Sequence, residues 1–386
     1  MLILTMVLAR LFGSSGYGEF VQMTTYVSFF YLLADFGFNA IYIQLQQTEK
    51  RQIWPVLLVT RLVVGALLCL IAFVILSLIP STQTTGYSNL VRIGILFLIP
   101  TIFFQSMITT ANGLFQKLLR YEWSMVSVTI GALCTVASLA LLMSSGSNSL
   151  LLYSVIPLCI GSAATAASSF FFVKKSHIPF DHITDKTVFR KFFFATLPLG
   201  LTLVFNVVYF HIDSIILTFF RSTSEVGIYG FAYKVFELAL VIPTFFMNAI
   251  YPEMVKKDSS ALHTFSKKVA ISLGGMSLVL LFIVWNAAPL FVYIRQDFFP
   301  SISALRILSL GFPLYFLSSL TMWMLITQKK QWKLVGIYGV SMCVNILLNF
   351  LFVPQHGYIA AAWITVIGEA IVLLASGAAV LYTKKL

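Results

Sequence analysis

The chain has 386 residues, of which 59% are hydrophobic and only 10% charged. Because an ordinary soluble domain carries about 25% charged residues, this composition excludes a soluble globular protein and indicates a polytopic membrane protein. The net charge of +12 would favour nucleic acid as a partner of a soluble chain. Here the basic residues lie between apolar stretches, so we expect no nucleic-acid partner.

Apolar stretches follow one another along the whole chain. They cover approximately residues 1–12, 20–45, 54–79, 88–114, 122–143, 150–173, 192–219, 226–251, 268–294, 302–327, 332–353 and 358–383. A membrane-spanning helix needs about 20 apolar residues, and only the first stretch is too short. We therefore predict an all-α membrane protein with about twelve transmembrane helices. Helix 1 is expected to be truncated, with about 15 to 20 of its residues missing.

Part of the second half of the chain has a copy in the first half. Residues 39–42, Asn-Ala-Ile-Tyr, recur at residues 248–251, and Gly18 and Gly227 precede the two copies by the same number of residues. Transporters are often built from two such repeated halves. We predict two six-helix lobes, residues 1–173 and 192–386, joined by a connector over residues 174–191.

Basic residues gather in alternate loops. Of the 25 lysines and arginines, 18 belong to one set of loops: Lys50, Arg51, Lys117, Arg120, Lys174, Lys175, Lys186, Arg190, Lys191, Lys256, Lys257, Lys267, Lys268, Lys329, Lys330, Lys333, Lys384 and Lys385. The opposite loops hold Arg92, Arg221 and Arg295. The positive-inside rule places the basic loops and both termini in the cytoplasm. The connector is expected to lie on an anionic leaflet.

Sequence signals of catalysis are missing. The four cysteines fall inside predicted spans without metal-ligand spacing, and the sequence contains no P-loop, GxGxxG, HExxH or GxSxG motif. We therefore predict no catalytic residue, no metal and no cofactor.

Short motifs recur in a fixed order over nearly the whole chain. They are Leu11-Phe12-Gly13, residues 16–20 (GYGEF), Leu197-Pro198-Leu199, residues 213–217 (DSIIL), 226–229 (VGIY), 232–234 (AYK) and 345–349 (NILLN), then Pro354, Gly357 and residues 360–362 (AAA). In order and spacing they resemble Wzx-type polysaccharide (O-antigen or oligosaccharide) flippases of the multidrug/oligosaccharidyl-lipid/polysaccharide exporter superfamily. The chain departs from that pattern at Ala360, where the family often has glycine, and in its short first helix.

The resemblance implies a MATE-like transporter, not an enzyme. Wzx-type proteins move undecaprenyl-diphosphate-linked oligosaccharides from the inner to the outer leaflet of the bacterial plasma membrane, for O-antigen, capsule or exopolysaccharide synthesis. The implied mechanism is alternating access. The implied partners are this lipid-linked sugar, membrane lipids, a proton or sodium gradient and the polysaccharide polymerase machinery.

Three other functions stay open. A cation-coupled multidrug antiporter of the same superfamily would favour a more acidic first lobe. A membrane polysaccharide polymerase or ligase would be expected to carry a large outer loop, which the predicted spans do not leave room for. A lipid II flippase would be expected to have additional helices.

Charged residues inside the predicted spans are the candidate site residues, because charges at that depth usually face a protein interior or a water-filled cavity. In the first half these are Arg10, Asp35 and Arg61. Arginine binds diphosphate well because its planar fork can donate two hydrogen bonds, so Arg10 or Arg61 is predicted to attract the substrate. The alternative is that Arg61 reaches the interface or pairs with Asp35.

In the second half the candidates are Asp213, Lys234, Glu237 and Glu369. Asp213 and Lys234 lie at similar depth on consecutive helices, so we predict an ion pair between them. Glu237 follows Lys234 by three residues and shares its helix face. Glu369 lies near mid-depth with no obvious partner, and Glu237 or Glu369 is predicted to couple transport to a proton or sodium gradient.

Overall fold

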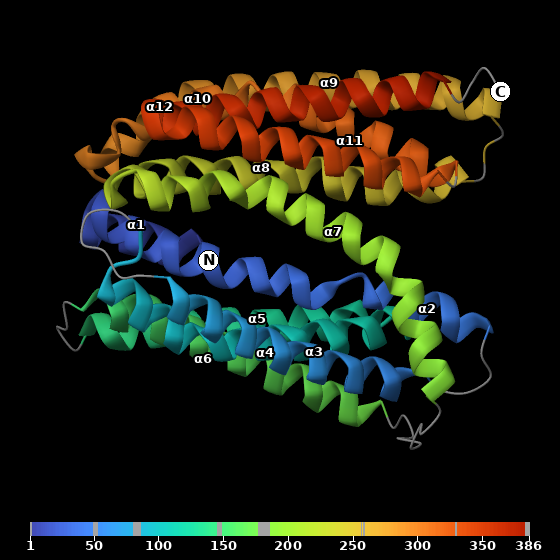
Figure 1. The fold of residues 1–386 in the computed structure, drawn as a ribbon, viewed down its shortest axis with the longest axis horizontal. Helices are drawn as coiled ribbons and strands as arrows, with labels where there is room; N and C mark the ends of the chain where they lie inside the picture. The colour runs from blue at the N-terminus through green and yellow to red at the C-terminus, as the bar shows by residue number, and fades with distance from the viewer. Residues whose placement is uncertain are drawn as a thin grey trace. The chain divides into compact units, whose positions relative to one another are not determined.

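The computed structural model describes residues 2–48, 53–79, 86–144, 149–176, 186–255, 257, 259–328 and 330–382, which are almost entirely helical (Figure 1). Of the predicted connector, residues 177–185 lie outside these ranges. The chain forms two compact units, Met1–Phe12 with Glu19–Val207, and Gly13–Gly18 with Val208–Leu386. The lobe boundaries drawn from the sequence stay a prediction.

The first unit holds most of α1 (Leu2–Asp35), then α2 (Phe38–Thr48), α3 (Trp54–Leu78), α4 (Asn89–Lys117), α5 (Tyr121–Ser144), α6 (Leu150–Lys175) and the beginning of α7 (Lys186–Phe220). The second holds the rest of α7, α8 (Thr223–Val255), α9 (Ser259–Ala287), the 3-10 helices η1 (Ala288–Tyr293) and η2 (Gln296–Phe298), α10 (Ser301–Ser309), α11 (Phe312–Thr327) and α12 (Gln331–Tyr382).

Each predicted apolar stretch corresponds to a helical segment. Within the described ranges, nine helices are long and apolar enough to cross a membrane, or ten if the bent pair α10–α11 forms one span. The longest, α12, is broken at Gly357 (φ 61°, ψ −145°). Residues 333–341 and 371–379 line one groove, so α12 folds back on itself and supplies two predicted spans. Gly13 (φ 68°) likewise breaks α1, at a position between the first two predicted spans. The all-helical membrane fold is confirmed.

An ion pair supports the break in α12. The positive φ of Gly357 belongs to the region that favours glycine, and a Cβ there would lie 2.2 Å from Glu225 Oε2. Glu225 Oε1 lies 2.9 Å from Arg221 Nη2, and Arg221 Nη1 donates to the carbonyl of Pro354 at 3.3 Å. The arginine thus supplies a donor to a carbonyl just before the break.

Other arginines close helix ends in the same way. The last four carbonyls of a helix have no intrahelical donor. Arg92 donates to the carbonyl of Leu76 in the last turn of α3 at 3.5 Å. Arg306 donates to the carbonyl of Trp285 near the end of α9 at 3.4 Å. The residue that would have donated to Trp285 is Pro289, which has no N–H.

The internal repeat reappears as a reciprocal contact between α1 and α8 within the second unit. Ser14 Oγ and Ser224 Oγ lie 2.8 Å apart. A Cβ on Gly18 would lie 1.9 Å from the carbonyl oxygen of Thr223, and one on Gly227 would lie 1.9 Å from that of Ser14. Since residues 14 and 18 correspond in the repeat to residues 223 and 227, the contact has the reciprocity of a two-fold interface. The two glycines let the helix backbones approach closely.

The first unit has a similar crossing between α5 and α6. A Cβ on Gly131 would lie 1.8 Å from Thr165 Oγ1, and one on Gly161 would lie 1.9 Å from Thr135 Oγ1. Small residues four apart on each helix permit this close packing, which drives helix association in lipid.

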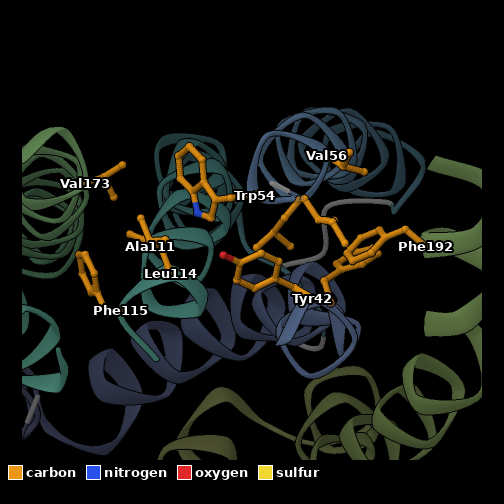
Figure 2. Close-up of a cluster of buried hydrophobic side chains, with 11 residues drawn as sticks. Tyr42, Trp54, Val56, Ala111, Leu114, Phe115, Val173 and Phe192 are labelled. Carbon is orange, nitrogen blue, oxygen red and sulfur yellow. The ribbon is translucent and has the colours of Figure 1, made fainter. Parts of the chain in front are cut away.

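A buried apolar cluster lies where α2, α3, α4, α6 and α7 of the first unit meet (Figure 2). It consists of Phe38, Tyr42, Ile53, Trp54, Val56, Leu57, Ala111, Leu114, Phe115, Val173 and Phe192. The Phe38 and Phe192 rings are stacked, with centroids 5.8 Å apart. Phe38 also packs against Arg61, whose guanidinium carbon lies 5.5 Å from the ring centroid. This cluster therefore supports the first group of candidate site residues.

Alanine at Gly18 or Gly227 is expected to destabilise the protein by similar amounts, because each new methyl group would collide with a backbone carbonyl of the other helix. Overpacking costs about 1–3 kcal/mol. Thermal unfolding of the purified protein would measure the loss. Gly274→Ala is the matched control, because nothing lies within 4 Å of a Cβ there. Equal melting temperatures for G18A and G274A would contradict the close crossing.

Candidate functional site

Arg61 on α3 is enclosed by hydrogen-bond acceptors. Its side chain is 0% exposed. Nη2 donates to Asp35 Oδ1 at 2.9 Å, to Asn39 Oδ1 at 2.8 Å and to the carbonyl of Asp35 at 3.4 Å. Nη1 donates to the carbonyl of Ala34 at 3.2 Å and to Thr109 Oγ1 at 2.5 Å. The guanidinium therefore links α1, α2, α3 and α4.

These contacts explain why an arginine lies here. α1 ends at Asp35, and the next residues, Phe36 and Gly37, both have positive φ (40° and 71°). The carbonyls of the last turn need outside donors, and a cation is favourable at a helix C-terminus. Arg61 provides both the hydrogen-bond donors and the positive charge, and it neutralises Asp35.

The alternative in which Arg61 pairs with Asp35 is confirmed by the 2.9 Å ion pair. The binding of a diphosphate by Arg61 stays a prediction, and its full burial favours the structural role. Asp35 is 43% exposed, so it is the accessible charge of this group. Arg10 is exposed on α1, three residues before the break at Gly13, and its binding role also stays a prediction.

Asp213, on α7 of the second unit, is buried among hydroxyl groups. Oδ1 accepts from the backbone N–H of Ser214 at 2.6 Å. Oδ2 accepts from the Tyr229 hydroxyl and from Thr365 Oγ1 at 3.3 Å. Thus α7, α8 and α12 each contribute a neutral donor to this carboxylate.

The predicted ion pair between Asp213 and Lys234 is wrong. Lys234 Nζ instead lies 2.8 Å from Glu237 Oε2, and the two side chains are 45% and 33% exposed. Similar depth on consecutive helices does not specify which face of each helix a side chain occupies. The prediction that Glu237 shares a face with Lys234 is confirmed.

Glu369, on α12, is the second buried carboxylate of this unit. Its side chain accepts hydrogen bonds from the Tyr209 hydroxyl at 3.2 Å and from Ser318 Oγ at 3.3 Å. In the part of the chain that the structure describes, no cation lies in ion-pair range of Glu369 or Asp213. Hydroxyl groups supply both hydrogen bonds to Glu369 and two of the three to Asp213.

The two carboxylates belong to one polar cluster. Thr365, a partner of Asp213, precedes Glu369 by one helical turn on α12, and Tyr209 interacts electrostatically with both acids. A buried carboxylate without a cation is costly, and binding a proton or a small cation removes that cost. No described group of three or more His, Cys, Asp or Glu residues has the geometry of a metal site.

The hydroxyl partners were missed because tyrosine, serine and threonine are common inside membrane helices. One signal existed for Tyr229. In the internal repeat it corresponds to Phe20, so its hydroxyl is an addition that distinguishes the second copy.

A protein-family model described as "Polysaccharide biosynthesis protein" matches residues 1–258. The chain belongs to this family. No curated protein matches the sequence.

Solved structures share the fold of this polysaccharide biosynthesis protein. One is the lipid II flippase MurJ in an inward closed conformation, with a TM-score of 0.77, 15% identity and coverage of 100% of this chain and 85% of that one. Another is an inward-facing multidrug resistance MATE family transporter of the MOP superfamily, with a TM-score of 0.76, 13% identity and coverage of 99% and 93%. A MOP superfamily transporter from Pyrococcus furiosus has a TM-score of 0.61, 16% identity and coverage of 99% and 90%.

At these identities the structures establish the fold alone. The polysaccharide biosynthesis protein is a multi-pass membrane protein of the MATE-like fold, as its sequence motifs predicted. Its structural neighbours are transporters and a flippase, not enzymes.

Arg61→Ala is expected to lower the yield of folded protein, because it leaves Asp35 and two carbonyls without their donor. Breaking a buried ion pair costs about 3–5 kcal/mol, and the partial exposure of Asp35 favours the lower end. Arg61→Lys should recover only part of the lost stability, since one ammonium group cannot reach acceptors on three different helices. Size-exclusion chromatography and thermal unfolding would measure both, with the exposed Arg10→Ala as control. A normally folded R61A protein that had lost transport would instead favour the binding role.

Proposed function

We propose that the protein is a flippase that moves undecaprenyl-diphosphate-linked oligosaccharides from the inner to the outer leaflet for surface polysaccharide synthesis, such as O-antigen, capsule or exopolysaccharide. The observation that carries the proposal is membership of the polysaccharide biosynthesis protein family over residues 1–258. The fold shared with a lipid II flippase fits a lipid-linked sugar as cargo. In this proposal the protein is not an enzyme, and it works beside the polysaccharide polymerase machinery.

The proposed setting is the bacterial plasma membrane, with both termini in the cytoplasm. The alternation of basic loops supports this setting and orientation. Among the described residues, Lys117, Lys174 and Lys175 lie at the ends of α4 and α6, and Lys330 and Lys333 lie at the beginning of α12. These ends would all face the cytoplasm.

The proposed mechanism is alternating access by the two repeated halves. MATE transporters of the same fold have been solved in inward-facing and outward-facing conformations. The exposed Arg10 would attract the diphosphate, and Asp35, at the other end of α1, would contribute a separate acidic group. The lipid chain would remain in the bilayer, because only the sugar and diphosphate need shelter from hydrocarbon.

The polar cluster around Asp213 and Glu369 would hold the coupling ion, a proton or sodium. Its oxygen donors and buried carboxylates suit either ion. Uptake of the ion would remove the cost of a buried negative charge, and this free energy would be available to shift the protein between its two conformations.

A cation-coupled multidrug antiporter is the second candidate. It is favoured by the nearly equal TM-score to a MATE transporter, 0.76, and by the accessible acidic group at Asp35. A polysaccharide polymerase or ligase has no such observation in its favour.

Complementation distinguishes the two candidates. In bacteria that lack their own oligosaccharide flippase, expression of the protein is expected to restore surface glycan, measured by lectin or antibody staining, because the family acts in polysaccharide synthesis. Cells that carry the empty vector are the negative control. Absence of glycan together with resistance to cationic dyes would contradict the flippase proposal and favour the antiporter.

Asp213→Asn and Glu369→Gln are expected to abolish the dependence of transport on the ion gradient, because a neutral amide cannot gain or lose the charge. Coupling free energies of about 1–3 kcal/mol correspond to changes in equilibrium affinity of about 5- to 150-fold. Glycan export would be measured with and without ionophores and at two pH values. Glu122→Gln is the control, since Glu122 is exposed and pairs with Arg120. Unchanged ionophore sensitivity in both folded variants would refute the coupling role.

A further inference from the structure

A groove with two lysines lies at the beginning of α9. It has a volume of about 380 Å³ and is lined by Lys257, Ala261, Thr264, Phe265 and Lys268. We call it the Lys257–Lys268 groove. The membrane-spanning part of this helix begins at Ala261, so the groove lies at the end of an apolar span, where a lipid headgroup would be.

Both lysines border the same groove, although only Lys268 belongs to the helix. Positions 261, 264, 265 and 268 follow the three- and four-residue spacing of a helix face. Lys257 precedes α9 and bends back over it, since its Nζ lies 4.8 Å from the centroid of the Phe265 ring. Phe265 is one helical turn from Lys268. The aromatic ring thus holds Lys257 toward the same groove as Lys268.

Among the described residues, the positive charge of this groove has no carboxylate partner. In the described ranges, no carboxylate lies in ion-pair range of Lys257 or Lys268. By contrast, Arg221 and Lys234 in the same unit both have a carboxylate within 3 Å. Two unpaired ammoniums bordering one groove attract an anion.

We propose that the Lys257–Lys268 groove binds the headgroup of an anionic phospholipid. The phosphate lies between the two ammonium groups, since lysine binds phosphate as a point charge. Ala261 and Phe265 form an apolar floor for the glycerol and the first acyl carbons. The apolar floor and the position at a membrane boundary favour a lipid over a soluble phosphate. This binding is separate from the proposed transport function and does not depend on it.

The test is lipid binding to the purified full chain in detergent, titrated with phosphatidylglycerol or phosphatidylcholine and followed by native mass spectrometry. A lysine near an anionic surface changes affinity by about fivefold. The protein is expected to prefer phosphatidylglycerol, and Lys257→Ala with Lys268→Ala is expected to weaken its binding by about 30-fold. Binding to phosphatidylcholine should not change.

Three further variants test the geometry. Lys267→Ala removes an exposed charge next to Lys268 that does not line the groove, and it is expected to bind like the wild type. Phe265→Leu keeps every charge but removes the ring that holds Lys257, and it should weaken binding by about two- to fivefold. Lys257→Arg with Lys268→Arg should preserve binding.

Two outcomes would overturn the proposal. Equal losses in K267A and K268A would mean that diffuse charge, not this groove, attracts the lipid. Displacement of phosphatidylglycerol by millimolar glycerol 3-phosphate would mean that the groove binds a soluble phosphate and not a lipid.

Discussion

The last carbonyl groups of a helix, and those just before a helix break, have no donor within their own helix, and this constraint explains where four of the arginines lie. Each unsatisfied group costs several kcal/mol in hydrocarbon. Arg61, Arg92, Arg221 and Arg306 each donate to a carbonyl at the end or break of another helix. An arginine suits this task because its donors are fixed in a plane and its charge persists. The same charge complements the negative end of the helix dipole.

The two units use their buried charges differently. In the first unit, the guanidinium of Arg61 is surrounded by acceptors, and Asp35 neutralises it, so the group holds four helices together. In the second unit, Asp213 and Glu369 are buried with hydroxyl partners and without a cation in the described ranges. The first arrangement is balanced and rigid. In the proposed coupling role, the second would become balanced on uptake of a proton or cation.

Duplication of the sequence has a physical consequence in the reciprocal crossing of Gly18 and Gly227. Because both copies carry glycine at the same position, each removes the side chain that would keep the other backbone away. In lipid, where the hydrophobic effect does not drive helices together, such close contact is a main source of association. The copies then diverged in chemistry, since Tyr229 carries a hydroxyl toward Asp213 where Phe20 has none.

The sequence by itself determined the helical membrane fold, the positions of the spans, the repeat and the family. The fold and the spans follow from hydropathy, which depends on neighbouring residues only, whereas the repeat follows from two matching segments and the family from the order of the motifs. It also determined that Glu237 shares a face with Lys234, because three residues is nearly one helical turn. Tertiary structure decided the rest: that Arg61 closes α1, that Asp213 faces Tyr229 and Thr365 and not Lys234, and that Ser318 and Tyr209 meet Glu369. Those partners come from different helices, and the rotation of each helix about its axis is set by packing against the others.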